Sequence, residues 1–293
     1  MTEPTFCAGM AEIAGHYDGL IVDQWGVLHN GSEPYPAAIE CLERLRAANK
    51  RVVLLSNSGR RVAFNRQRLE SMRFSDRLFD AVVTSGEAAW RALRDRADPF
   101  FAGLGPRCLL WAEGGDRSVA EGLDVELVGR VEDADFIFLV GTDKGSTLAD
   151  FEPDLQAALA RGLPMVCSNP DIIVVTAQGT VMAPGAVAQR YAALGGRVAY
   201  TGKPHAPIYR LCREFLAPLP TGAILAVGDS LEHDVAGGAA AGLETALVMG
   251  GIHAPSFDLQ GGEAGNGPAL ERLTRQHGAT PRWVLPAFRW APA

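Results

Sequence analysis

The sequence predicts an α/β protein with a parallel-sheet core and a second α/β domain inserted into it. Apolar runs too short for helices alternate with helical patterns along its 293 residues. Several of these runs end in a polar residue beside glycine, as expected of buried parallel strands whose tips face a crevice. The length suits two domains of roughly 150 residues each.

The first strand is predicted at 19–23, where the apolar run Gly19-Leu20-Ile21-Val22 ends in Asp23. Ligands of open α/β sheets bind beyond the carboxyl ends of the strands, so Asp23 is a candidate catalytic carboxylate. Aspartate is also a favoured turn residue, and a purely structural role stays open when Asp23 is considered alone.

A helix is predicted from Pro36, because its apolar residues recur at spacings of three and four. The next strand, 51–55, leads into Ser56-Asn57-Ser58-Gly59. A hydroxyl at a strand tip, followed by small residues and two arginines, suits a phosphate oxygen. A purely structural role for Ser56, as the cap of the following helix, stays open when it is considered alone.

The βα alternation continues through the middle third with different turn residues. Strands are expected at 79–85, 107–111, 135–140 and 164–167, and helices from Glu87 and over 151–160. Residues 86–195 are therefore predicted as the inserted domain, which leaves 1–85 and 196–293 as a discontinuous core. Within the insertion, Asn169-Pro170-Asp171 follows a strand, and its proline favours a simple turn when nothing else is considered.

The last third carries a lysine and two acids at turns. Lys203 follows a short strand, 198–200, and precedes a proline, which favours a non-helical turn. A helix at 207–215 leads to the apolar strand 222–227, and Asp229 and Asp234 come next. Both carboxylates can face one crevice. Asp234 has an alternative role at the start of the helix 235–242, whereas Asp229, after so apolar a strand, needs a partner.

The C-terminal part is predicted from weaker patterns. A strand is expected at 245–249, a glycine-rich loop at 255–268, a helix at 270–276 and an edge strand at 282–285.

The composition of the chain argues against two classes of binding partner. A net charge of −7 argues against nucleic acid and anionic membranes as partners, since these attract basic surfaces. The five scattered cysteines fit reduced thiols, and neither a leader pattern nor a membrane-length apolar run is present. We therefore expect a cytoplasmic protein with no membrane partner, with the oligomeric state left open and a homodimer included.

Taken together and in order, the motifs resemble those of the haloacid dehalogenase-like (HAD) hydrolase superfamily. The matching stretches are Asp23-Gln24-Trp25-Gly26-Val27-Leu28, Leu55-Ser56-Asn57, Gly202-Lys203-Pro204 and Gly228-Asp229-Ser230 with Asp234. The chain is most similar to subclass IIA, the 4-nitrophenylphosphatase-like and sugar-phosphatase-like proteins. Asn169-Pro170-Asp171 matches a motif of that subclass. The resemblance implies a Rossmann-like core with a large α/β cap.

The resemblance also implies phosphoryl transfer through an aspartyl-phosphate. Asp23 would attack phosphorus, Ser56 would bind a phosphoryl oxygen, and Lys203 would offset the shared negative charge. Mg²⁺ would be held by Asp23, the Trp25 carbonyl, Asp229 and Asp234. Substrate binding, to a small phosphorylated metabolite, is assigned to Ser56, Asn57, Asn169, Asp171 and Lys203.

One position departs from the family pattern. Phosphatases of the family place a proton-transferring aspartate two residues after the nucleophile, where this chain has Trp25. Indole cannot transfer a proton at neutral pH, so a slow phosphatase is expected unless another group substitutes. His29 and His233 are candidates by sequence proximity, although a core or surface histidine is the favoured interpretation of each.

Two other functions are weighed against the phosphatase. A non-catalytic protein that binds a phosphorylated ligand on the same fold is the alternative. A dehalogenase is disfavoured, because that chemistry needs no metal and both Asp229 and Asp234 are present.

Overall fold

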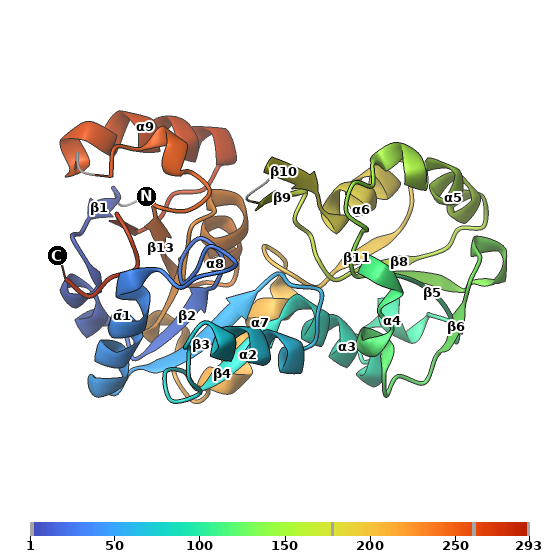
Figure 1. The fold of residues 1–293 in the computed structure, drawn as a ribbon, viewed down its shortest axis with the longest axis horizontal. Helices are drawn as coiled ribbons and strands as arrows, with labels where there is room; N and C mark the ends of the chain where they lie inside the picture. The colour runs from blue at the N-terminus through green and yellow to red at the C-terminus, as the bar shows by residue number, and fades with distance from the viewer. Residues whose placement is uncertain (1–2, 177–178, 260–261, 292–293) are drawn as a thin grey trace. The chain divides into compact units, whose positions relative to one another are not determined.

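The computed structural model describes residues 3–176, 179–259 and 262–291. Contacts divide the chain into two compact units (Figure 1). Unit 1 comprises Met1–Ser56, Arg66–Val83 and Tyr209–Ala293, and unit 2 comprises Asn57–Asn65 and Thr84–Ile208. The domain limits expected from the sequence, 85/86 and 195/196, stay a prediction.

Unit 1 is built on a seven-stranded sheet in the order β1-β14-β13-β12-β2-β3-β4. The strands are β1 (Thr5–Phe6), β2 (Gly19–Asp23), β3 (Arg51–Ser56), β4 (Ala81–Thr84), β12 (Ile224–Gly228), β13 (Glu244–Val248) and β14 (Trp283–Leu285). The pairs β1–β14, β14–β13, β13–β12, β12–β2 and β2–β3 run parallel. From β2 the chain adds β3 on one side, and much later β12 on the other, so the strand order reverses at β2. Ligand sites of open α/β sheets form at such a point.

Helices accompany these strands in chain order. Their bounds are α1 (Pro36–Ala47), α2 (Val62–Ser71), α7 (Ala206–Leu216), α8 (Ala236–Ala240) and α9 (Gly262–His277). In α1 the buried residues Ala38, Cys41, Leu42 and Leu45 recur at spacings of three and four, which gives the helix one apolar face. A π-helical turn, Leu231–Val235, comes between β12 and α8.

Unit 2 contains a five-stranded parallel sheet in the order β11-β8-β7-β5-β6. The strands are β5 (Arg107–Trp111), β6 (Glu126–Val128), β7 (Phe136–Leu139), β8 (Met165–Cys167) and β11 (Val198–Tyr200). The helices are α3 (Ser85–Asp95), α4 (Pro99–Ala102), α5 (Leu148–Ala160) and α6 (Pro184–Ala193). An antiparallel pair, β9 (Ile173–Thr176) and β10 (Gly179–Met182), completes the unit.

Alternating residues of the unit 2 strands belong to two different hydrophobic clusters. Phe136 and Phe138 of β7 pack with Ala89 and Leu93 of α3. Ile137 and Leu139 of the same strand pack instead in the cluster that contains buried residues of α5 and α6. Because successive strand residues point to opposite faces, helices cover both faces of this sheet.

The α/β architecture with a Rossmann-like parallel core is confirmed, and so are most of the predicted strands and helices. The expected loop at 255–268 is wrong in its second half, because α9 begins at Gly262. The buried Asn266 side chain accepts from the Asp258 N–H (2.7 Å) and donates to the Asp258 carbonyl (2.6 Å). These bonds tie the glycine-rich turn of the helix to the preceding segment, which composition alone does not reveal.

The strand expected at 282–285 is present as β14, but it is not an edge strand. It pairs with β13 on one side and with the two-residue β1 on the other. The Thr5 N–H donates to the Arg282 carbonyl (3.0 Å) and the Cys7 N–H to the Val284 carbonyl (2.9 Å). A strand as short as β1 has no hydrophobic periodicity from which it could be predicted.

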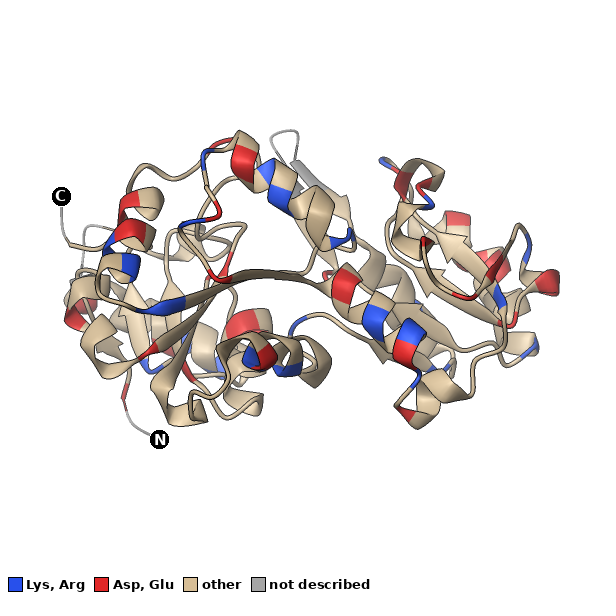
Figure 2. Cartoon of the chain, turned by 90° about the horizontal axis from the view of Figure 1, so that it is seen from below, with Lys and Arg blue, Asp and Glu red and all other residues tan. Residues whose placement is uncertain are grey.

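Three general expectations can be compared with the structure. All five cysteines are buried and free of disulfides, as predicted. Within the described ranges, no helix combines the length and the apolar character that a membrane crossing requires. Figure 2 shows basic and acidic residues interspersed along the helices, and the expected absence of a nucleic-acid partner stays a prediction.

Candidate functional site

The acidic residues predicted from the sequence come together at the carboxyl ends of two paired strands. Asp23 is the last residue of β2, and Asp229 directly follows β12. Val22 of β2 lies opposite Val227 of β12. Asp23 and Asp229, which come one and two residues later, therefore lie at the same edge of the sheet, on neighbouring strands. Asp234 joins them from the π-helical turn that follows.

The three carboxylates form a compact, buried cluster. One oxygen of each lies within 4.8 Å of the others, and the residues are 7%, 7% and 4% exposed. The Ile252 N–H donates to Asp229 Oδ2 (2.7 Å), and the Ser230 N–H donates to Asp234 Oδ2 (3.1 Å). These main-chain bonds fix the direction of two of the three carboxylates.

Glycines allow the backbone to approach the acids this closely. A Cβ added at Gly26 would lie 2.0 Å from Asp229 Oδ2, and one at Gly251 would lie 2.1 Å from the same atom. A Cβ at Gly228 would lie 2.0 Å from Asp234 Cγ. Gly26 has φ +81°, a conformation that residues with a Cβ rarely adopt. The turn after β2 is therefore shaped around the Asp229 carboxylate.

The donor set of this cluster fits a hard divalent cation. Carboxylate oxygens are the ligands that Mg²⁺ and Ca²⁺ prefer in proteins. Three acids within 4.8 Å repel one another when ionised, and a cation between them offsets that repulsion. Within the described part of the chain, this is the one group of three or more potential ligand residues close enough to share an ion.

Ser56 ends the strand on the other side of β2. Asp23 lies opposite Leu55 in the β2–β3 pairing, so Ser56 is one residue beyond the partner of Asp23. Its half-buried side chain thus belongs to the same sheet edge as the carboxylates.

Lys203 and Asn57 meet in unit 2 and are both buried, at 3% and 6% exposure. The Lys203 N–H donates to Asn57 Oδ1 (2.7 Å), and Asn57 Nδ2 donates to the Lys203 carbonyl (3.2 Å). Asn57 Nδ2 also donates to Asp171 Oδ1 (2.8 Å). Asn169 completes the group, because its Oδ1 accepts the Asp171 N–H (3.0 Å).

Comparison with family models identifies the family of this chain. A family model described as haloacid dehalogenase-like hydrolase matches residues 20–126, and a second, HAD-hydrolase-like model matches residues 200–275. Between them they cover the segments that contain Asp23, Ser56, Lys203 and both later acids. The chain belongs to the haloacid dehalogenase-like hydrolases.

Relatives within the HAD superfamily include named phosphatases. Chronophin of Bos taurus is 28% identical over 267 residues, which are 84% of this chain and 85% of the relative. The D-glycerol 3-phosphate phosphatase of Mycobacterium tuberculosis is 27% identical over 245 residues, which are 83% of this chain and 66% of the relative.

Solved HAD structures share the whole architecture. A haloacid dehalogenase-like hydrolase from Brucella suis has a TM-score of 0.81 at 28% identity, covering 96% of this chain and 99% of that one. The 4-nitrophenylphosphatase of Thermotoga maritima has a TM-score of 0.71 at 26% identity, covering 94% and 95%. The expected subclass IIA and the expected enzyme class, a HAD-like phosphoric monoester hydrolase, are confirmed.

Trp25, the departure from the HAD phosphatase pattern, is held by its own set of neighbours. The guanidinium of Arg68 lies over the indole at 5.5 Å from its centroid and donates to the Gly31 carbonyl. A Cβ at Gly31, whose φ is +99°, would lie 2.3 Å from the indole Cη2. The side chain is 37% exposed, so one part of the ring is packed against these neighbours and the rest is accessible to solvent.

His29 is buried beside Trp25 and does not suit proton transfer at neutral pH. Burial, and next the charge of Arg68, lower its pKa to about 4. Its Nδ1 accepts the Gly31 N–H (3.1 Å), as expected of a neutral ring. The interpretation of His29 as a core histidine is thereby favoured. The other candidate, His233, is held through its main chain, whose carbonyl accepts from Tyr209 Oη (3.0 Å).

The sequence-predicted residues thus gather in two groups, while their roles stay predictions. Asp23, Asp229 and Asp234 cluster in unit 1, with Ser56 and Trp25 next to Asp23 on the same sheet edge. Asn57, Asn169, Asp171 and Lys203 gather in unit 2.

Sequence reasoning missed two contributions to the acidic cluster. The loop Gly251–Ile252 binds Asp229, and the pair Gly250-Gly251 after a predicted strand was the available signal. Tyr35 was also missed: burial, and then the nearby Asp229 carboxylate, raise the pKa of its phenol. No local sequence pattern connects Tyr35 with an acid so far along the chain.

Proposed function

We propose that the chain is a Mg²⁺-dependent phosphatase that hydrolyses a small phosphorylated metabolite through a phosphorylated Asp23. The observation that carries this proposal is the cluster of three buried carboxylates at the end of β2 and β12 in a HAD-like chain. Support for a phosphorylated small molecule comes from relatives such as the D-glycerol 3-phosphate phosphatase.

Asp23 is the proposed nucleophile. One carboxylate oxygen forms a bond to phosphorus while the ester P–O bond breaks and the leaving group takes that electron pair. Water then attacks the phosphorus of the aspartyl-phosphate, which releases inorganic phosphate and regenerates the carboxylate. The position of Asp23 at a strand tip beside the order reversal of the sheet supports this role.

Asp23, the Trp25 carbonyl and Asp229 are proposed to hold Mg²⁺, with Asp234 supporting the site. A bound cation supplies charge stabilisation to the transferring phosphoryl group. The main-chain bonds from Ile252 and Ser230 hold the Asp229 and Asp234 carboxylates before any ion binds, so little reorientation is needed.

Ser56 and Lys203 are proposed to act on the phosphoryl oxygens. The Ser56 hydroxyl donates a hydrogen bond, and the Lys203 ammonium offsets negative charge. Their support is the order of the motifs along the chain and the burial of Lys203, an unusual environment for a lysine.

Proton transfer to the leaving group is the weak step in this chain. Trp25 has no acidic proton to give, and His29, with a pKa of about 4, is almost entirely unprotonated at pH 7. We therefore propose that turnover depends on the leaving group, with aryl, enol or acyl phosphates preferred over alkyl phosphates. General acid catalysis typically contributes roughly 10²–10⁴ in rate, which sets the scale of this preference.

The alternative function is a protein that binds a phosphorylated ligand without hydrolysing it. Trp25 is the observation that favours it, because the cation and phosphate groups are retained while the acid is missing.

The experiment is a phosphate-ester panel with and without Mg²⁺, run on wild type and Asp23→Asn. If the chain is a phosphatase, the wild type should hydrolyse at least the aryl ester with Mg²⁺, and Asp23→Asn should not. Beryllofluoride should form an adduct on Asp23 of the wild type. Near wild-type turnover in Asp23→Asn excludes Asp23 as the nucleophile. Binding of phosphate and Mg²⁺ without hydrolysis of any ester favours the binding protein.

A further inference from the structure

The Asn57 amide is paired with the main chain of Lys203 on both of its polar atoms. Asn57 Oδ1 accepts the Lys203 N–H at 2.7 Å, and Asn57 Nδ2 donates to the Lys203 carbonyl at 3.2 Å. The side chain thus binds Lys203 as a neighbouring peptide group binds a strand residue. Both residues are buried, and in such an environment hydrogen bonds are directional and costly to lose.

Asp171 accepts the second hydrogen bond that the Asn57 amide nitrogen donates. An amide nitrogen has two hydrogens, and Asn57 Nδ2 donates to the Lys203 carbonyl and to Asp171 Oδ1, the latter at 2.8 Å. A carboxylate accepts only, so Asp171 also dictates which end of the amide is nitrogen. Asp171 is in turn held by its own N–H, which donates to Asn169 Oδ1.

The turn that carries Lys203 is closely packed at Gly202. A Cβ at Gly202 would lie 2.5 Å from Pro170 Cδ, 2.6 Å from Ser85 Oγ and 2.7 Å from Asn57 Oδ1. The turn is therefore packed directly on Asn57 and on the segment that contains Asp171.

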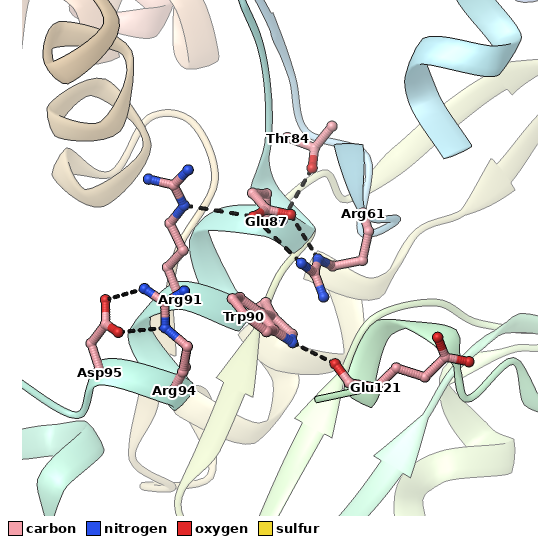
Figure 3. A network of polar contacts seen from close by, with 8 residues as sticks. All are labelled: Arg61, Thr84, Glu87, Trp90, Arg91, Arg94, Asp95 and Glu121. Carbon is pink, nitrogen blue, oxygen red and sulfur yellow. Dashed lines mark hydrogen bonds and ion pairs between the residues drawn. The ribbon is translucent and has the colours of Figure 1, made fainter. Parts of the chain in front are cut away.

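The segment that contains Asn57 is fixed within unit 2 by a second network (Figure 3). Arg61 Nε donates to Glu87 Oε2 at 2.7 Å, and the Arg61 guanidinium lies 3.9 Å from the Trp90 ring centroid. Glu87 also pairs with Arg91 (3.6 Å), and Trp90 Nε1 donates to the Glu121 carbonyl (2.8 Å). Arg61 thus holds segment 57–65, to which Asn57 belongs, against α3.

We propose that Asp171 and Asn57 are positioning residues that hold Lys203, and that neither uses these groups to bind substrate. Asp171 orients the Asn57 amide, and Asn57 fixes the backbone from which the Lys203 side chain extends. This inference deepens the proposed function, on which it rests, by replacing two substrate-binding assignments with one positioning device. A catalytic group misplaced by about 1 Å can lower the rate by roughly 100-fold.

The test compares Asp171→Ala with the conservative Asp171→Asn, using Asp154→Ala on the exposed side of α5 as the control. The first readout is kcat and KM on an aryl phosphate with Mg²⁺. The second is hydrogen exchange of the Lys203 amide, measured by NMR, which reports the bond to Asn57 Oδ1 without any need for turnover.

Asp171→Ala should lower kcat by roughly tenfold or more, leave KM within threefold, and speed exchange at the Lys203 amide by at least tenfold. Asp171→Asn should stay within threefold of wild type in all three quantities, because its amide oxygen accepts the same hydrogen bond. If Asp171→Ala does not fold, Asn57→Ser removes both bonds to Lys203 directly and should show the same changes.

A raised KM in Asp171→Asn with an unchanged Lys203 amide overturns the proposal, because it indicates a substrate contact. Unchanged exchange in both Asp171→Ala and Asn57→Ser overturns it as well. Failure of the proposed function looks different: wild type then hydrolyses no ester, while the exchange measurement still decides whether Asp171 positions Lys203.

Discussion

The backbone of Gly26 lies against the carboxylate of Asp229, so close that a Cβ at position 26 would stand 2.0 Å from Oδ2. The two residues follow β2 and β12, the strands between which the order of the sheet reverses. This contact makes the shape of the turn after Asp23 depend on a carboxylate more than 200 positions further along the chain.

Gly26→Ala should therefore disturb the acidic cluster. The added methyl group clashes with Asp229 and strains a backbone at φ +81°, the latter at a cost of roughly 1–2 kcal/mol. We expect a lower melting temperature and a much weaker stabilisation by Mg²⁺. Gly278→Ala is the matched control, since its φ is +64° and nothing lies within 4 Å of the position that its methyl group would take. An equal response to Mg²⁺ in the two variants would contradict the contact.

Asp229→Asn should remove most of the stabilisation that Mg²⁺ gives the wild type. A ligand at 100 times its Kd adds about 2.7 kcal/mol to the free energy of unfolding, which thermal melts detect easily. Asparagine still accepts the Ile252 N–H, so the loop stays attached while the charge is lost. Asp76→Asn, an exposed acid of unit 1, is the control, and EDTA should reverse the wild-type shift. A wild-type response in Asp229→Asn would show that the cation binds elsewhere.

Much of the fold was predictable because the two large sheets are mostly parallel and their strands alternate with helices along the chain. Strands such as Gly19–Asp23 are buried along their whole length, so they appear as continuous apolar runs that end at a polar tip. β1 and the start of α9 were missed for the opposite reason. Each depends on hydrogen bonds between distant or irregular segments, such as those of Asn266 with Asp258, and these leave no periodic pattern.

The acidic cluster was predictable because parallel strands bring their carboxyl ends to one edge. Asp23 and Asp229 are found together for that reason alone. The packing around Trp25 was not predictable, since only the tertiary fold brings Arg68 and Gly31 next to the indole. The pairing of Asn57 with Lys203 joins residues 146 positions apart, and sequence spacing gives no indication of it.

His29 should make the stability of the protein depend on pH. Its folded pKa of about 4 lies below the unfolded value of about 6.5, so the unfolded chain binds the proton more readily. The contribution is fully present above pH 6.5 and is lost as the pH falls toward 4. The shift corresponds to about 3 kcal/mol. The measurement is urea unfolding in metal-free buffer at pH 7 and pH 4.5, comparing wild type with His29→Asn.

Asparagine at this position can accept the Gly31 N–H as His29 Nδ1 does, but it does not titrate. The stability difference between wild type and variant should therefore shrink, or change sign, on going from pH 7 to pH 4.5. A difference that is the same at both values would mean that His29 is protonated equally in the folded and unfolded chains.

Trp25→Asp tests the one position where this chain departs from HAD phosphatase chemistry. A carboxyl group there can protonate the leaving oxygen and then activate water, so turnover of glycerol phosphate should rise at least roughly tenfold. For 4-nitrophenyl phosphate, whose leaving group needs little protonation, the gain should be smaller. Trp25→Asn is the control, because it removes the same ring and adds a side chain of equal size that carries no acidic proton.

The environment of the Trp25 indole determines how the substitutions at this position affect folding and the pKa of the new carboxyl group. Full burial of a tryptophan would make its loss cost about 3–5 kcal/mol, but this ring is 37% exposed, so both variants should fold, as circular dichroism can check. Arg68 lies over the ring, 5.5 Å from its centroid, and we expect its charge to favour the ionised form of the new carboxylate. The double variant Trp25→Asp with Arg68→Gln removes that charge and should then give the larger gain. If neither Trp25→Asp variant exceeds Trp25→Asn on glycerol phosphate while wild type hydrolyses it briskly, another residue supplies the proton.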